Sequence, residues 1–424
     1  MNTTAYLYRK LIPDYWFDMI ENPQSFEECD GYLDARIKAI PKGRSFIFVT
    51  DPHCFEAHKR PLKPINVLNS PAIIGYIRAM TGINKVVMGG DVIERGANKF
   101  LGLQEFLIYN NEMIAVAGKD YLVVHGNHDQ NTPNIPMNKE SIDNFMIPYT
   151  VTNDKLFSHI TDRVCEDESI ILAKLEKAGA TDEQKKEYLA YSKLHYYVDD
   201  DENKIRYIII DSGSPGYGRN GVVEELFGVY NNSEMILQYD FVASALMTVP
   251  EGYNVAVAGH ALLGYEGNTK ISDVMLGICK LLSGYRTRSK IQVRNVFTGK
   301  ENLEKYYAGG WHEYDFTNVK GNPNVVVMAA DIHTDVQTKA DYDENGNFVS
   351  SPYHGEILPE TAIIVNATQT DCIWGQSLKF PERNNPMTKG THTEQCFDVV
   401  TFLDSGNIRM TRIGAGKDRE VKYN

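Results

Sequence analysis

The residues best suited to chemistry stand where short apolar stretches of this 424-residue sequence end. Five such stretches run directly into side chains that can bind a cation, namely Asp51 with His53, Asp91, Asn127, His260 and His333. Side chains two residues apart at the end of a strand leave on the same side, so Asp51 and His53 can approach one ion. A carboxylate beside an imidazole suits Mn, Fe or Zn better than Ca. Asp91 follows Gly90, which permits close approach of the backbone, and its two oxygens can bridge two cations.

Each of these motifs has an ordinary structural explanation when it is taken alone. A strand-end aspartate often caps the following turn, and a single histidine on an apolar face is usually a core residue. The segment Gly126-Asn127-His128-Asp129 is less common, because it places much polarity directly after a buried stretch. Core packing does not require a polar group at the end of all five stretches, whereas a shared metal centre does. The sequence therefore predicts that the five ends meet around metal ions.

Buried strands must position these residues. Short, β-branched and almost wholly apolar runs are typical of strands that are covered on both faces. The runs that precede the candidate ligands span residues 45–50, 85–88, 121–124, 255–258 and 325–328. Helical segments at residues 70–81 and 97–117 separate the first three runs, and this alternation predicts a layered α/β core in which ligands gather where strands end. Further strands, of which the last two form a hairpin, are expected at residues 206–210, 362–365, 398–403 and 408–411.

The length of the chain allows two or three domains, or one large core with insertions. The spread of the motifs favours one large core. We expect residues 1–40 to form an N-terminal extension and residues 41–424 the main domain, with insertions at about 154–195 and 261–320. The second insertion is polar and rich in Gly, Lys, Arg and Tyr, with a helical stretch near residues 272–283. We expect it to cap the site.

The composition limits the partners of the protein. A formal net charge of −13 makes nucleic acid an unfavourable partner, because non-specific binding to it needs clustered Lys and Arg. Bound cations would still allow a small phosphorylated substrate. The six cysteines are dispersed without a CxxC motif, which favours free thiols over disulfides. The N-terminal stretch lacks the apolar core of a signal peptide, and no run approaches the ~18 apolar residues of a membrane span. The sequence therefore predicts a cytoplasmic protein without a membrane partner.

In their order, the motifs resemble the calcineurin-like metallophosphoesterase superfamily, whose pattern is DxH, GDxx(D/E), GNH(D/E), a lone His and GHxH. The matching segments are residues 51–53, 90–94, 126–129, 259–260 and 330–333. A single block has little weight, whereas five in the right order are specific. The resemblance implies an α/β four-layer sandwich of two mixed β-sheets flanked by helices. It also implies a centre with two divalent metal ions, which would be Mn, Fe or Zn, or else Mg.

The resemblance further implies a role for each residue. The ligands of one metal would be Asp51, His53 and His333, those of the other Asn127 and His260, and the bridge Asp91. His128 would protonate the leaving group or steady the phosphate, and Glu94 would orient His128. One position departs from the pattern, because Asp331 stands where the family has the first histidine of its last block. As a metal ligand, Asp331 would favour a harder ion, Mn or Mg over Zn, at the second position, or would weaken that site.

Two further segments resemble relatives within the superfamily. Residues 90–96 resemble the GDxxDRG block of Ser/Thr protein phosphatases, in which the arginine grips the substrate phosphate. Arg95 is therefore a candidate for phosphate binding, and an arginine that faces solvent at the start of a helix is the alternative. Residues 411–419 resemble the tail of phosphoesterases from bacterial phages and prophages, where they could form a phosphate-cradling loop or a turn.

The implied activity is hydrolysis of phosphomonoesters or phosphodiesters through in-line attack of a metal-bridging hydroxide. A small phosphorylated substrate fits the acidic chain best. A phosphoprotein substrate is a further possibility, because Arg95 resembles the phosphate-binding arginine of the protein phosphatases. A nuclease of the same superfamily is one alternative, and it would need a local basic groove. A catalytically degenerate, phage-associated metal-binding structural module is the other, and Asp331 keeps it open.

Overall fold

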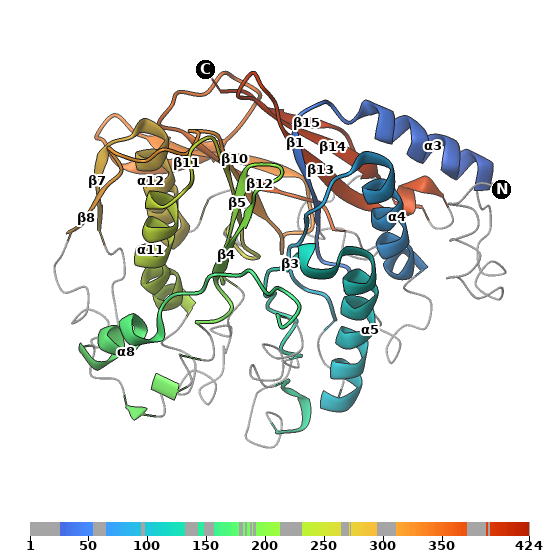
Figure 1. The fold of residues 1–424 in the computed structure, drawn as a ribbon, viewed down its shortest axis with the longest axis horizontal. Helices are drawn as coiled ribbons and strands as arrows, with labels where there is room; N and C mark the ends of the chain where they lie inside the picture. Colours follow the sequence, from blue (N-terminus) through green and yellow to red (C-terminus); the bar gives the residue numbers. More distant parts are fainter. Residues whose placement is uncertain are drawn as a thin grey trace.

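The computed structural model describes residues 26–53, 65–94, 98–131, 143–147, 157–177, 181–182, 185–186, 189, 192–212, 231–263, 271, 273–294, 311–370, 387–388 and 391–423. Within them, two mixed β-sheets stand side by side, and helices cover the outer face of each (Figure 1). This is the four-layer α/β arrangement that the family resemblance implies, and the prediction is confirmed.

The first sheet has the strand order β15-β14-β13-β1-β2-β3. Its strands are β1 (Arg44–Val49), β2 (Val86–Met88), β3 (Tyr121–Val123), β13 (Cys396–Phe402), β14 (Ile408–Gly414) and β15 (Arg419–Val421). Strands β1, β2 and β3 are parallel, so their carboxyl ends lie at one edge. The antiparallel strands β13, β14 and β15 extend the sheet from the other side of β1.

The second sheet has the order β11-β10-β12-β9-β6-β5-β4. Its strands are β4 (Tyr196–Asp200), β5 (Ile205–Ile209), β6 (Asn254–Ala258), β9 (Val325–Ala329), β10 (Val336–Tyr342), β11 (Phe348–Pro352) and β12 (Ile363–Ala367). The four central strands β5, β6, β9 and β12 are parallel and wholly buried. A separate ribbon pairs β7 (Lys290–Arg294) with β8 (Trp311–Asp315).

Helices form the two outer layers. On the side of the first sheet lie α3 (Phe26–Ala39), α4 (Ile65–Thr81) and α5 (Lys99–Ala117), and on the opposite side lie α11 (Asn231–Met247) and α12 (Asp273–Thr287) (Figure 1). Helix α4 packs against α5, and α11 packs against α12. Further helical elements are α8 (Glu168–Lys177), η2 (Gly118–Asp120) and η4 (His392–Glu394).

Apolar packing and buried hydroxyls join the two sheets. Phe46 of β1 meets Tyr207 of β5 edge to face, with 5.4 Å between the ring centroids. The Tyr196 hydroxyl of β4 donates to the carbonyl of Val123 at 3.0 Å and accepts from its N–H at 2.9 Å. These contacts fix the position of the edge strand β3 against the second sheet, and with it the loop that follows β3.

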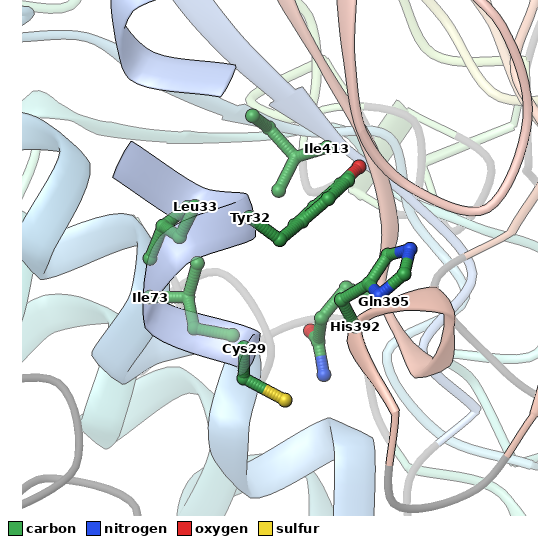
Figure 2. Close-up of a pocket in the computed structure, with 7 residues that line it drawn as sticks. All are labelled: Cys29, Tyr32, Leu33, Ile73, His392, Gln395 and Ile413. Atoms are coloured by element: carbon green, nitrogen blue, oxygen red, sulfur yellow. The ribbon is translucent and has the colours of Figure 1, made fainter. Parts of the chain in front are cut away.

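Helix α3 packs against the C-terminal strands, and a small cavity lies between them (Figure 2). The cavity is lined by Cys29, Tyr32, Leu33, Ile73, His392, Gln395 and Ile413. The Tyr32 hydroxyl donates to the carbonyl of Gly414 at 3.1 Å and accepts from its N–H at 2.9 Å, and the Tyr32 ring stacks on His392. None of the predicted site residues lines this cavity.

All nine strands predicted from the sequence are present, and so are the three predicted helices and the hairpin between β13 and β14. The helix expected near residues 272–283 is α12, which packs on α11 and against β11 and β12 in the outer layer. The division into a main domain with two insertions stays a prediction. Cys29, Cys165, Cys279 and Cys396 take part in no disulfide bond. Among the described helices, none combines the length and apolar character that crossing a membrane requires.

Candidate metal centre

Loops from both sheets converge at the carboxyl ends of β1, β2, β3, β6 and β9. Backbone hydrogen bonds tie them together: the N–H of Asp51 donates to Gly90 at 3.0 Å, and the N–H of His53 donates to Asp91 at 3.1 Å. Across the seam between the sheets, the N–H of Asp331 donates to the Asp51 carboxylate at 3.3 Å. The predicted convergence of five strand ends is therefore present in the fold.

The backbone at these loops adopts an unusual conformation. Eight described residues other than glycine have positive φ, and the five at this centre, with φ between 44° and 66°, are Asp51, His53, Asp91, Asp331 and His333. The left-handed region costs an L-residue roughly 1–2 kcal/mol. Strain of this kind persists only where the surroundings hold it, and it concentrates at functional sites.

Asp51, His53 and His333 form the first cluster of candidate ligands. The Nε2 atoms of the two imidazoles are 3.1 Å apart, and His333 Nε2 lies 3.2 Å from Asp51 Oδ1. His53 Nε2 lies 3.7 Å from the same oxygen. Three donor atoms on buried or half-buried side chains thus face one point, and this donor set suits Mn, Fe or Zn.

His260 is the centre of the second cluster. Its Nδ1–H donates to the carbonyl of Gly89 at 2.7 Å, which leaves Nε2 directed at the centre. Nε2 lies 3.0 Å from Asn127 Oδ1, 3.2 Å from Asp91 Oδ2 and 3.8 Å from Asp331 Oδ1. Oδ2 of Asp331 is buried and has no hydrogen-bond partner among the described residues. An unpaired buried carboxylate oxygen beside three other donors fits a bound cation.

Asp91 lies between the two clusters. Its Oδ2 is 3.2 Å from His260 Nε2 on one side and 3.8 Å from His53 Nε2 on the other. Its Oδ1 accepts the backbone N–H of His128 at 2.7 Å, which fixes the orientation of the carboxylate. Glycines allow this close approach, because a Cβ on Gly126 would overlap the backbone and carboxylate of Asp91.

The buried acids and imidazoles strongly perturb one another. Burial opposes the ionisation of Asp51, but contacts to His333 and His53 outweigh it and hold the pKa of Asp51 well below its usual range. Burial would likewise lower the pKa of His260, but Asp91 raises that pKa well above its usual value. For Asp331, burial combined with the nearby carboxylates raises the pKa to about 6. The centre therefore concentrates negative charge that a divalent cation would compensate.

Glu94 connects two imidazoles. Its Oε1 lies 3.4 Å from His128 Nδ1, and its Oε2 lies 3.2 Å from His53 Nδ1. The sequence suggested a contact with His128 alone, so the contact with His53 is an addition.

Burial lowers the pKa of His128. His128, His53 and Asp91 also form a third cluster that could hold a metal. Arg95 lies outside the described residues.

Asp129 organises the centre in a way that the sequence analysis missed. Its carboxylate accepts the N–H groups of Gly126 at 2.8 Å, Val92 at 2.7 Å and Asp91 at 3.1 Å. One buried side chain thus joins the loop after β2 to the loop after β3. The acidic residue that ends the GNH(D/E) block was the signal that could have identified it.

We expect Asp129→Ala to lower the free energy of unfolding by about 2–4 kcal/mol, because three buried N–H groups lose their acceptor. Asp129→Asn keeps one carbonyl oxygen and should lose less. Urea unfolding in the presence of EDTA, followed by circular dichroism, measures both changes without a contribution from metal release. An alanine variant as stable as the wild type would contradict the role assigned to Asp129.

The chain belongs to the calcineurin-like phosphoesterase family, whose model matches residues 44–262. The matched region carries the candidate ligands from Asp51 to His260, and Asp331 and His333 follow it. The protein is therefore a metal-dependent hydrolase of phosphate esters. Among solved structures, a dimetal phosphatase from Danio rerio is similar at 10% identity and a TM-score of 0.45, covering 90% of this chain and 100% of its own. No curated protein matches the sequence significantly.

Proposed function

We propose that the protein is a dinuclear phosphoesterase that hydrolyses a small phosphomonoester or phosphodiester. One observation carries the proposal: the carboxylate of Asp91 lies between two sets of converging ligand atoms at a buried seam. Asp51, His53 and His333 would hold one ion, and Asn127 and His260 the other. A carboxylate placed between two such sets suits the role of bridging ligand.

The two ions would supply Lewis acidity, which lowers the pKa of a coordinated water and draws charge from the phosphoryl oxygens. The protein's own residues orient the site and move the proton. His128 is the candidate proton donor to the leaving group, since its side chain reaches the centre and is partly exposed. Glu94 Oε1 lies 3.4 Å from His128 Nδ1, so it would favour a proton on that nitrogen and leave Nε2 to face the substrate.

Asp331 distinguishes this centre from the family pattern. Its Oδ1 lies 3.8 Å from His260 Nε2, so it stands on the side of the second ion. An extra carboxylate there adds negative charge and favours a hard cation. We therefore propose Mn or Mg, rather than Zn, for the second position.

The size of the substrate is inferred from the net charge of the protein. A net charge of −13 opposes long-range attraction to nucleic acid, which supports a small substrate over a nuclease role. Arg95, the candidate for gripping the phosphate, remains part of the proposal from its sequence motif. The degenerate binding module is the competing hypothesis that the assay must exclude.

The test is hydrolysis after controlled metal loading. The protein is stripped with EDTA, reloaded with Mn²⁺, and assayed on p-nitrophenyl phosphate, bis-p-nitrophenyl phosphate and single-stranded DNA. We expect two bound equivalents of metal and metal-dependent cleavage of at least one of the small esters. Two bound ions without cleavage of any substrate would overturn the proposal in favour of the binding module. Cleavage of DNA in preference to both small esters would favour the nuclease.

A further inference from the structure

A network of two arginines and two aspartates links the His333 loop to the C-terminal strands, and its members are buried or partly buried. We call it the arginine network, and its members are Asp335, Asp398, Arg412 and Arg419. Asp335 follows His333 by two residues and directly precedes β10 of the second sheet. The other three come from β13, β14 and β15 of the first sheet (Figure 1). The network therefore crosses from one sheet to the other beside the metal centre.

Arg412 is the hub of the network, and its side chain is only 1% exposed. Its Nε donates to Asp398 Oδ1 at 2.9 Å, in a cross-strand pair between β14 and β13. Its Nη2 donates to Asp335 Oδ1 at 2.6 Å. Its Nη1 donates to the carbonyl of Ala415 at 2.8 Å. The three nitrogens thus bind three different groups, which the planar guanidinium allows and a lysine ammonium cannot reproduce.

Asp335 is held from several directions. Besides Arg412, its Oδ1 accepts the backbone N–H of Gln369 at 3.0 Å and lies 3.5 Å from Nη1 of Arg419. Arg419 in turn donates to the Ala367 carbonyl at 2.8 Å. The side chain at the end of the His333 loop is therefore fixed to β14, to β15 and to the segment that follows β12.

The loop needs such an anchor. Asp331 and His333 both have positive φ, at 66° and 54°, and this strained conformation must be imposed by the surroundings. A buried ion pair adds little net stability compared with apolar packing. Its hydrogen-bond geometry is directional, however, and it fixes the position of the backbone that carries it.

We propose that Arg412, acting through Asp335, is a positioning residue that holds His333 where it can bind metal. The inference rests on the proposed function in one respect only, namely that His333 is a ligand. It assigns a function to residues 411–419, for which the sequence left a phosphate-cradling loop and a turn open. Two arginines of this segment face buried carboxylates rather than a substrate.

The test compares metal affinities, not activities. Arg412→Lys keeps the charge but loses the three-way geometry, and Asp335→Asn keeps the size but loses the charge. We expect each to weaken Mn²⁺ binding at one of the two sites by about 10–100-fold in calorimetric titration, while the other site changes by less than about 2-fold. His333→Ala identifies the affected site, because it should remove the same binding event.

Arg206→Lys is the matched control. Arg206 is also buried and makes a cross-strand pair, with its Nε 2.7 Å from Asp199 Oδ1 and its Nη2 2.6 Å from Asp199 Oδ2. Its further contacts are to Ala245 in the last turn of α11 and to Thr248 directly after that helix. We expect its Mn²⁺ affinities to equal those of the wild type.

Each outcome decides the inference. Folded Arg412→Lys and Asp335→Asn proteins with unchanged affinities would overturn it, as would an equal loss in Arg206→Lys. If circular dichroism shows that Arg412→Lys does not fold, the milder Asp335→Asn variant decides. A wild-type protein that binds no divalent ion would also overturn it. A wild-type protein that binds two ions but cleaves no ester refutes the proposed function alone and leaves the affinity comparison valid.

Discussion

Asp91→Asn is expected to remove bound metal and activity together, with kcat/KM falling by at least about 10³-fold. Oδ2 of Asp91 lies 3.2 Å from His260 Nε2 and 3.8 Å from His53 Nε2, so both ligand clusters depend on it. An amide in its place offers one neutral oxygen, and its NH₂ group cannot bind a cation. The centre would then lose the one carboxylate that lies between the two clusters.

Elemental analysis and esterase assays of the same preparation measure this effect. Asp200→Asn is a suitable control, because Asp200 is also a buried aspartate but caps the turn after β4, where it accepts the N–H groups of Glu202 and Asn203. The control should keep its metal and its activity. Full metal content in Asp91→Asn would show that this carboxylate is not the bridge.

His128→Ala should give the opposite pattern, with both ions retained and kcat reduced by ~10²–10⁴-fold. The His128 side chain is 14% exposed, more than His53 or His260, and its Nε2 lies 3.8 Å from Asp91 Oδ2. It therefore reaches the centre from the open side, where a leaving group would depart. Its loss removes a proton donor but none of the proposed ligands.

The competing possibility is specific. Because His128, His53 and Asp91 also form a cluster compatible with metal binding, loss of an ion in His128→Ala would make His128 a ligand and not an acid. His159→Ala serves as the control, since His159 is a partly buried histidine whose Nε2 donates to the carbonyl of Tyr121 in the same strand that leads to His128. It should change neither metal content nor kcat.

The sequence predicted the strands best where they are most apolar. Strands β1, β2, β3, β6 and β9 are wholly or almost wholly buried, so their apolar composition alone was enough to predict them as strands. Because parallel strands end at one edge, their polar ends could be placed together without coordinates. Strand β10 was not predicted, because its residues alternate between buried and partly exposed positions and form no apolar run.

Contacts between distant residues could not be read from local patterns. The GNH(D/E) block draws attention to Asp129, but it does not show that this side chain receives three N–H groups. No motif draws attention to Asp335, which faces two arginines. Residues 261–320 were expected to cap the site because they are polar, and this stays a prediction. Helix α12, which lies within them, packs on α11 and against β11 and β12.

The ligand atoms come from strand ends of both sheets, with Asp51 and Asp91 on one and His260 and His333 on the other. An ion bound at either cluster would therefore act as a cross-link between the halves of the sandwich. Sliding of one sheet along the other would break coordination before it disturbed much apolar packing. Metal binding at the centre and the alignment of the two sheets are thus coupled. A measurement of bound metal would therefore also report on how the sheets are aligned, and the reverse.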